Sequence, residues 1–267
     1  GGKTYPVEVL AVRMFEGEGE SLIKNITSIT LPEGLKRLEK NSLYSEVVSA
    51  TEVTIPASVE YVGTYFLRGE TLKKITFKGS PVLADNSVGT NYKLIHFMSQ
   101  TPPSVGKYSF QSAHLMVVAP DVASIPVYRT TLSGHWGVEK GYELSVYGGL
   151  KEADNVYYSA MEDGNACAIY FDGTQTSVAL SKTIQIDGAA RALAKIQRGL
   201  FYYKNITEVI VPETVKTIGG NAFYKCSALT SLQLPSGVEE IGDYAFYECS
   251  ALAIDVTLPG LKTLGKG

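Results

Sequence analysis

The chain has 267 residues, of which 45% are hydrophobic, so it can bury a sizeable core in one large or two ordinary domains. Its formal net charge of −3 leaves no basic surplus for the phosphates of nucleic acid or for anionic lipid head groups. No apolar run approaches the roughly 20 residues of a membrane-spanning helix. The opening Gly1-Gly2-Lys3 has no apolar signal core, as is typical of a sequence trimmed of a targeting segment.

The first half contains four short stretches in which apolar and polar residues alternate. They are Ile29–Leu31, Val53–Ile55, Ile75–Phe77 and Ile95–Phe97. Alternation with a period of two predicts β-strands with one buried and one exposed face. A proline follows each of the first two stretches, and because proline has no N–H to donate, we expect those strands to end there.

The middle of the chain departs from this pattern. Leu115–Pro120 predicts a strand, and Val127–Trp136 predicts a short helix that carries Tyr128 and Trp136. Next, Asn155–Tyr158 and Ala166–Phe171, joined through Glu162–Gly164, predict a β-hairpin.

The second half repeats itself with a period of 23 residues. Five residues recur at this offset: Pro212, Ala222, Phe223, Cys226 and Leu229 return as Pro235, Ala245, Phe246, Cys249 and Leu252. In each copy the alanine and phenylalanine pair a small residue with a large one, which we expect to close the far side of a coil.

The rest of the repeat can be interpreted position by position. Leu232 and Leu234 alternate with polar residues and are expected to face the interior. Val238 and Ile241 turn the returning segment inward, and Gly242 allows a tight backbone turn. One such coil cannot bury its own core, so copies are expected to stack about 4.8 Å apart.

Stacking in this frame places three core residues in register, namely Val209, Leu232 and Val256. The copy that begins at Val256 stops after Gly265 without an alanine–phenylalanine pair. We therefore expect the last coil to have an apolar edge, covered by further residues of a longer chain or by a partner.

This 23-residue pattern resembles the BspA-like leucine-rich repeat family, and the resemblance covers roughly Val7–Phe110 and Ile184–Gly265. It implies a β-rich leucine-rich repeat solenoid of short parallel strands, turns and short helical segments. In that family a strand and helix end a stack and a hairpin opens one. The resemblance therefore implies two units: 1–148, with a cap at about 115–147, and 149–267, opened by a hairpin at about 155–171.

The resemblance also implies a function, since known members are mostly bacterial cell-surface or secreted proteins. Several are associated with adhesion to host matrix proteins or to other cells. The implied role is that of a secreted or surface-displayed, non-enzymatic protein that binds a protein partner. A glycan partner is the alternative, and it would need exposed aromatic residues beside carboxylates or amides.

If a partner binds the strand face, its contacts are expected at the polar positions that alternate with core residues. These are Ser28, Thr30, Glu52, Thr54, Lys74, Thr76, Glu208, Ile210, Ser231, Gln233, Asp255 and Thr257. The face has no Trp, Tyr or Arg anchor, which predicts weak single-site affinity raised by many copies. The alternative is binding through loops, such as the irregular segment expected at Ser80–Asn91.

No enzyme motif is present, and no cofactor or metal is expected, because the three histidines lie in separate segments without ligand spacing. Cys226 and Cys249 hold equivalent positions in adjacent coils, where stacked free thiols are favoured over a disulfide. Five tyrosines could form a binding strip, but we favour a role in covering the coil and do not assign them as a site. They are Tyr202, Tyr203, Tyr224, Tyr244 and Tyr247.

Overall fold

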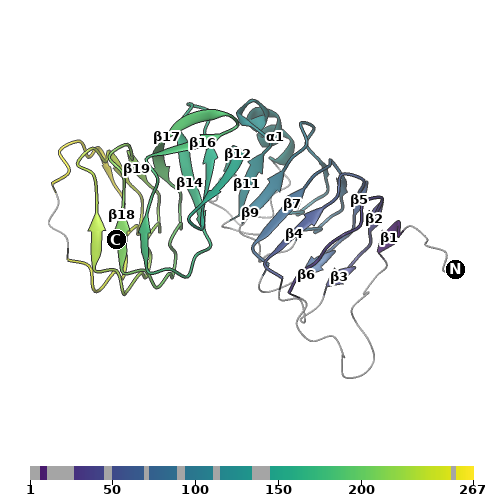
Figure 1. The fold of residues 1–267 in the computed structure, drawn as a ribbon, viewed down its shortest axis with the longest axis horizontal. Helices are drawn as coiled ribbons and strands as arrows, with labels where there is room; N and C mark the ends of the chain where they lie inside the picture. The colour runs from purple at the N-terminus through teal and green to yellow at the C-terminus, as the bar shows by residue number, and fades with distance from the viewer. Residues whose placement is uncertain are drawn as a thin grey trace, which may run out of the picture. The chain divides into compact units, whose positions relative to one another are not determined.

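The computed structural model describes residues 7–10, 27–44, 50–68, 72–88, 94–110, 115–133, 145–253 and 257–267. They form a β-solenoid of about eight turns with little helix, as predicted (Figure 1). The chain divides into two compact units, Gly1–Tyr147 and Gly148–Gly267, called here unit 1 and unit 2.

The described strands of unit 1 each contain two or four residues. They are β1 (Val9–Leu10), β2 (Arg37–Leu38), β3 (Leu43–Tyr44), β4 (Glu52–Ile55), β5 (Tyr61–Val62), β6 (Leu67–Arg68), β7 (Lys74–Phe77), β8 (Val82–Leu83), β9 (Leu94–Phe97), β10 (Ser104–Val105) and β11 (Met116–Ala119). A 3₁₀ turn, η1 (Val122–Ser124), and the helix α1 (Ile125–Leu132) follow.

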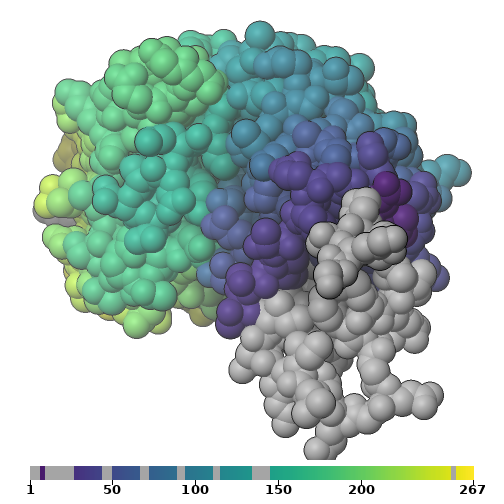
Figure 2. Space-filling view, turned by 45° about the vertical axis from the view of Figure 1, so that its right-hand side comes forward, coloured from purple at the N-terminus to yellow at the C-terminus, as the bar shows by residue number. Residues whose placement is uncertain are grey.

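The described strands of unit 1 form three parallel sheets: a small one of β3 and β6, and two larger ones that both contribute residues to the core. One has the order β4, β7, β9, β11, and the other the order β1, β2, β5, β8, β10. Core residues stack in register along the first sheet, with Val53 beside Ile75 and Ile75 beside Ile95. In the space-filling view the purple and blue turns of this unit adjoin one another (Figure 2).

The sequence explains why β4 begins and ends where it does. Its burial alternates strictly, with Val53 and Ile55 buried and Glu52 and Thr54 exposed. Pro56 follows the last strand residue and has no N–H to donate to a ladder. The predicted strands at Ile75–Phe77 and Ile95–Phe97 are confirmed as parts of β7 and β9, and the one predicted at Leu115–Pro120 contains β11. The stretch at Ile29 makes a single bridge, from Thr30 to Thr54.

The segment expected to be irregular, Ser80–Asn91, is instead part of the stack, and that prediction was wrong. It contains β8, which pairs with β5 and β10, and Val88 bridges to Phe110. Asn86 takes a left-handed conformation that asparagine accommodates well, so the turn fits without a glycine. The last residues of the segment lie outside the described residues.

A short helix covers the core after β11, as predicted. The Asp121 carboxylate caps η1 by accepting from the Ser124 N–H at 2.9 Å. In α1 the buried Tyr128 lies with its ring centroid 5.3 Å from that of Phe97, and its hydroxyl donates to the Ser99 carbonyl. The helix ends at Leu132, and Trp136 is outside the described residues.

The strands of unit 2 begin with β12, whose first two residues precede the unit's start at Gly148. They are β12 (Val146–Ala153), β13 (Val156–Ala160), β14 (Ala166–Phe171), β15 (Ser177–Ala179), β16 (Thr183–Ile186), β17 (Ala189–Ile196), β18 (Glu208–Ile210), β19 (Thr217–Ile218), β20 (Ser231–Gln233), β21 (Glu240–Ile241) and β22 (Thr263–Leu264). The predicted hairpin is confirmed as β13 and β14, which pair antiparallel, and β12 adds a third antiparallel strand.

A second hairpin, β16 with β17, was not predicted. Asp187 and Gly188 form its two-residue turn with φ of 52° and 74°. Two successive positive φ values are the signature of a type I′ turn, for which Asp-Gly is a favoured sequence. The Asp187-Gly188 dipeptide was the sequence signal for this hairpin. It was not used because the resemblance to the repeat family was taken to begin at Ile184.

The repeats of unit 2 form two parallel sheets. One consists of β15, β18 and β20. The other consists of β17, β19, β21 and β22, and it continues the sheet of the β13–β14 hairpin, because β17 pairs with β14. Val209 lies in register between Val178 and Leu232, which confirms the predicted pairing of Val209 with Leu232. Val256 is outside the described residues.

Truncating a stacked core residue should cost much more stability than truncating its exposed neighbour. Leu232 is 8% exposed, whereas Gln233 on the same strand is exposed. Leu232→Ala should lower the free energy of unfolding by about 2–5 kcal/mol, and Gln233→Ala by less than about 0.5 kcal/mol. Urea unfolding followed by circular dichroism measures both, and equal losses would contradict the repeat frame.

Candidate functional site

The strand face of unit 1 is the outward side of β4 and β7. Two outward rows run across these strands in register: Glu52 beside Lys74, and Thr54 beside Thr76. Thr30 extends the second row on one side through its bridge to Thr54. The sequence-predicted contacts of this half therefore lie together, apart from Ser28, which is exposed and precedes the bridge.

Charge on this face is internally paired. The Lys74 ammonium lies 2.7 Å from a Glu52 carboxylate oxygen, and the lysine side chain is only 16% exposed. His96, which the register places beside Thr76, is half-buried. Burial, and then the charge of Lys74, lower the pKa of His96 to about 4, so this histidine is neutral at physiological pH.

A hollow of about 590 Å³ opens at the edge of this face. It is lined by residues 29–33 and 52–54, together with Pro56 and Lys78. Three predicted contacts, Thr30, Glu52 and Thr54, are therefore part of its wall. The Lys78 ammonium pairs with the Glu33 carboxylate at 3.2 Å, so the lining combines apolar, hydroxyl and charged groups.

The strand face of unit 2 is a separate surface on β15, β18 and β20. Ser177, Glu208 and Ser231 form one outward row, and Ala179, Ile210 and Gln233 form the next. The Ser177 hydroxyl donates to the Glu208 carboxylate at 2.8 Å. Of the remaining predicted contacts, Thr257 is exposed but outside any strand, and Asp255 is outside the described residues.

A strip of stacked tyrosines lies elsewhere on unit 2, at the turns that contain the core phenylalanines. We call it the tyrosine strip; its members are Tyr202, Tyr203, Tyr224, Tyr244 and Tyr247. Tyr202, Tyr224 and Tyr247 stack from turn to turn with ring centroids 5.1 Å and 5.2 Å apart. Burial, and then the neighbouring phenols Tyr203 and Tyr224, raise the pKa of Tyr202.

The tyrosines of the strip are more exposed to solvent than residues whose only role is to cover the core would be. Tyr203 is 57% exposed, and Tyr202, Tyr244 and Tyr247 are about 40% exposed. The core beneath is closed by other residues, since Phe201 and Phe223 are fully buried and stack 5.2 Å apart. The interpretation favoured from the sequence, in which the tyrosines serve to cover the coil, therefore does not explain their exposure.

A pair of opposite charges borders the strip. The Lys225 ammonium lies 5.3 Å from the ring centroid of Tyr203 and 5.6 Å from that of Tyr224, both within cation–π range. It also lies 3.4 Å from a Glu248 carboxylate oxygen. Lys225 and Glu248 occupy equivalent positions of successive turns, 23 residues apart.

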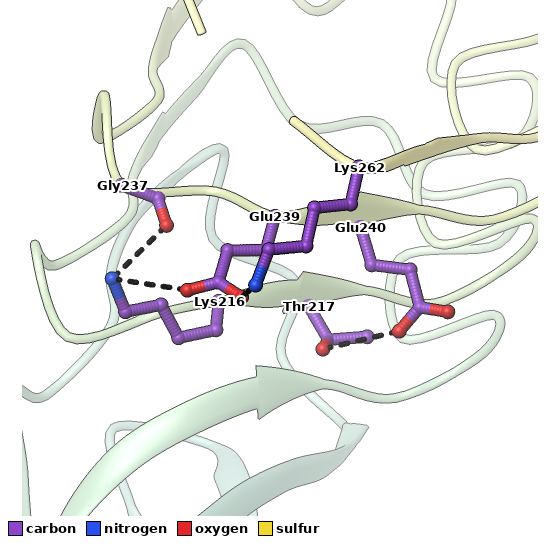
Figure 3. A network of polar contacts seen from close by, with 6 residues as sticks. All are labelled: Lys216, Thr217, Gly237, Glu239, Glu240 and Lys262. Carbon is purple, nitrogen blue, oxygen red and sulfur yellow. Dashed lines mark hydrogen bonds and ion pairs between the residues drawn. The ribbon is translucent and has the colours of Figure 1, made fainter. Parts of the chain in front are cut away.

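A ladder of alternating charge runs along the other sheet of unit 2 (Figure 3). Glu239 lies between Lys216 and Lys262, with oxygen–nitrogen distances of 3.7 Å and 2.6 Å. The hydrogen bond from Lys262, and then its charge, lower the pKa of Glu239. Because solvent screens exposed pairs of this kind, they add little to stability. The 23-residue recurrence of Lys, Glu and Lys was the signal that the sequence interpretation missed.

The cysteines are free thiols, in line with the interpretation favoured from the sequence. The Cys226 and Cys249 thiols donate to the Phe201 and Phe223 carbonyls, each at 3.0 Å. Burial raises the pKa of Cys226 to about 12, so it is not a reactive thiolate. Within the part of the chain that the structure describes, no group of three or more His, Cys, Asp or Glu residues is placed to hold a metal ion.

The fold and these surfaces define a repeat solenoid that presents several faces. The BspA type leucine rich repeat region, in six copies, matches residues 21–116 and 194–267. The matched residues are well over half of the chain, and the protein belongs to this family.

Several solved structures are similar to this chain. A leucine-rich repeat protein from Bacteroides capillosus is 21% identical, with a TM-score of 0.41, over 45% of this chain and 99% of that one. The pneumococcal vaccine antigen PcpA is 18% identical, with a TM-score of 0.44, over 97% of this chain and 64% of that one. A leucine rich cell surface protein from Faecalibacterium prausnitzii is 15% identical, with a TM-score of 0.34, over 95% and 83%.

Among curated proteins none matches this chain. Across the described residues, no helix is long and apolar enough to cross a membrane.

Proposed function

We propose that this protein is a non-enzymatic, secreted or cell-surface adhesion module that binds a protein partner through its strand face. The observation that carries the proposal is the hollow beside β4, whose wall includes Thr30, Glu52 and Thr54. A flat solvated sheet offers a partner no recess, whereas this hollow can receive a side chain and surround it with hydroxyl, carboxylate and apolar groups.

The chemistry of the face favours a weak contact. The outward residues are short or already paired, as Glu52 is with Lys74. Tight interfaces usually depend on Trp, Tyr and Arg anchors, which these rows lack. We expect micromolar or poorer affinity for a host matrix or cell-surface protein, raised by display of many copies.

Export to the cell surface is part of the same proposal. Membership of the BspA type family supports it, because known members of that family are mostly bacterial surface or secreted proteins.

Glycan binding is the second candidate, favoured by exposed tyrosines beside the Glu248 carboxylate. A sugar ring packs on an open aromatic face. In the tyrosine strip the faces of Tyr202, Tyr224 and Tyr247 are directed at one another. We therefore rank a protein partner first.

An exchange of charge on the strand face tests the proposal. The double variant Glu52→Lys/Lys74→Glu keeps an ion pair and the net charge, but it exchanges the positions of the positive and negative charges beside the hollow. Beads carrying wild-type protein or the variant are incubated with solubilised extracellular matrix, and bound proteins are compared. We expect the proteins retained by wild type to be lost from the variant by at least tenfold.

The matched control is Lys36→Glu/Glu60→Lys. This pair has the same 2.7 Å separation but lies beside β2 and β5, on the other sheet. It should bind like wild type, and both variants should melt within about 2 °C of it. Binding that survives the strand-face exchange would exclude this face. Retention on a glycan array in place of matrix protein would support the second candidate.

A further inference from the structure

We propose that the tyrosine strip is a self-association surface, on which a second copy of this chain docks through its own strip in antiparallel orientation. The inference is independent of the proposed function, because the strip and the strand face are different surfaces.

The first argument is that the most exposed tyrosine of the strip is placed where the backbone disfavours it. Tyr203 and Tyr244 adopt φ of 57° and 56°, in the left-handed region that favours Gly and Asn. In the two turns before Tyr244, the equivalent left-handed position, with the same turn-to-turn hydrogen bond, is held by Gly199 and Asn221. Tyrosine is strained there, and its exposed ring recovers little burial in the monomer. Tyr65 and Tyr108 of unit 1 share this conformation and exposure, so what distinguishes the strip is that its strained tyrosines adjoin rings that stack from turn to turn.

The second argument is the periodicity of the strip. The rings of Tyr202, Tyr224 and Tyr247 repeat every 5.1–5.2 Å, the spacing of successive turns. A partner can contact the rings of several turns in the same way only if its own side chains repeat at this spacing. A second solenoid of the same pitch has this property. Phenol hydroxyls both donate and accept hydrogen bonds, so one row of tyrosines is complementary to another.

The third argument is charge. Lys225 and Glu248 lie side by side on adjacent turns. A two-fold axis between them places Lys225 of each copy opposite Glu248 of the other, as an isologous contact requires. A partner with a single sign of charge would repel one of the two residues.

The area predicts a weak dimer. Each partly exposed tyrosine offers about 100 Å², so two strips with their bordering charges bury roughly 1,000 Å² in total. This is the lower limit for a specific interface, a size at which weak and transient contacts are found. Such affinity gives reversible contacts between copies concentrated on a surface.

Sedimentation equilibrium of the full chain between about 10 and 500 µM tests the proposal. We expect wild type to show a reversible monomer–dimer equilibrium. Lys225→Glu and Glu248→Lys, each alone, should weaken it at least tenfold, because each places like charges opposite one another. An equimolar mixture of the two variants should restore association, since one variant then carries two acidic residues and the other two basic ones.

A matched pair of tyrosine variants distinguishes association through the strip from nonspecific association through any exposed tyrosine. Tyr203→Asn keeps a residue suited to the left-handed conformation but removes a ring, and it should weaken the dimer at least tenfold. Tyr108→Asn removes an equally exposed tyrosine with φ of 53° from unit 1, and it should leave the dimer unchanged. Melting temperatures confirm that all variants fold.

Several results would overturn the proposal: monomers at every concentration, a dimer that persists in Tyr203→Asn, or a mixture that does not restore association. Wild-type monomer that binds oligosaccharides on an array, with binding lost in Tyr203→Asn, would also overturn it and assign the strip to glycans. The strand-face variant Glu52→Lys/Lys74→Glu should still dimerise, so failure of the proposed function is distinguishable from failure here.

Discussion

Replacing Gly242 with alanine should lower the free energy of unfolding by about 3 kcal/mol or more, one of the larger effects of a single methyl group. A Cβ at Gly242 would lie 2.4 Å from the Gly220 backbone nitrogen and 2.8 Å from its Cα. Both are backbone atoms of the preceding turn, so no side chain can move aside. Urea unfolding at constant temperature measures the loss.

Gly260→Ala is the control for the general effect of replacing glycine. Its added Cβ would meet the Val238 carbonyl at 3.8 Å, an ordinary contact, and its φ is not in the left-handed region. We expect a change within about 0.5 kcal/mol. If both variants lost the same stability, the close approach of turns at Gly242 would not be the cause.

Phe223→Ala should lower the free energy of unfolding by about 3–5 kcal/mol, the range for removing a buried aromatic ring. The Phe223 ring is fully buried, with the rings of Phe201 and Phe246 stacked 5.2 Å away on either side. Its loss leaves a cavity inside the stack that the flanking turns cannot close without breaking their own register. Thermal and urea unfolding both report the change.

Phe246→Ala provides the comparison within the same row. Phe246 stacks on Phe223 but is half-buried, so its removal opens a site to solvent in place of a sealed cavity. We expect less than half the loss of Phe223→Ala. A larger loss at Phe246 than at Phe223 would contradict the described stacking.

The sequence predicted those parts of the fold in which one pattern repeats. Alternation at Val53–Ile55 and Leu232–Leu234, ended in each case by proline, was enough to locate the strand face and the register of Val209 with Leu232. Recurrence of alanine and phenylalanine located the far side of the coil.

The second sheet was beyond reach from the sequence, because strands of two residues such as β5 and β21 are too short to show a period. The role of Gly242 was only partly inferred. A tight turn was expected, whereas the structure shows that the glycine is required by the backbone of a neighbouring turn.

The candidate sites were predicted unevenly for a similar reason. Outward strand residues follow from alternation, so Glu52 and Lys74 could be identified, but their ion pair depends on register between turns. The hollow depends on three segments that meet in space. The exposure of Tyr203 depends on how completely Phe201 and its neighbours close the core. That closure is a property of three-dimensional packing and cannot be read from the sequence.

Turn-by-turn hydrogen bonding has a mechanical consequence. Backbone bonds such as Tyr203 N–H to the Tyr224 carbonyl and Lys225 N–H to the Tyr247 carbonyl join each turn to the next. The outermost turn is hydrogen-bonded to one neighbouring turn, whereas an interior turn is hydrogen-bonded to two. We therefore expect a chain pulled at its end to unfold from that end, one turn at a time. Each 23-residue repeat then releases roughly 80 Å of extended chain where about 5 Å was stacked. In the proposed adhesive role, such a stack would act as an extensible tether that lengthens in steps under shear and limits the force on the contact with the partner.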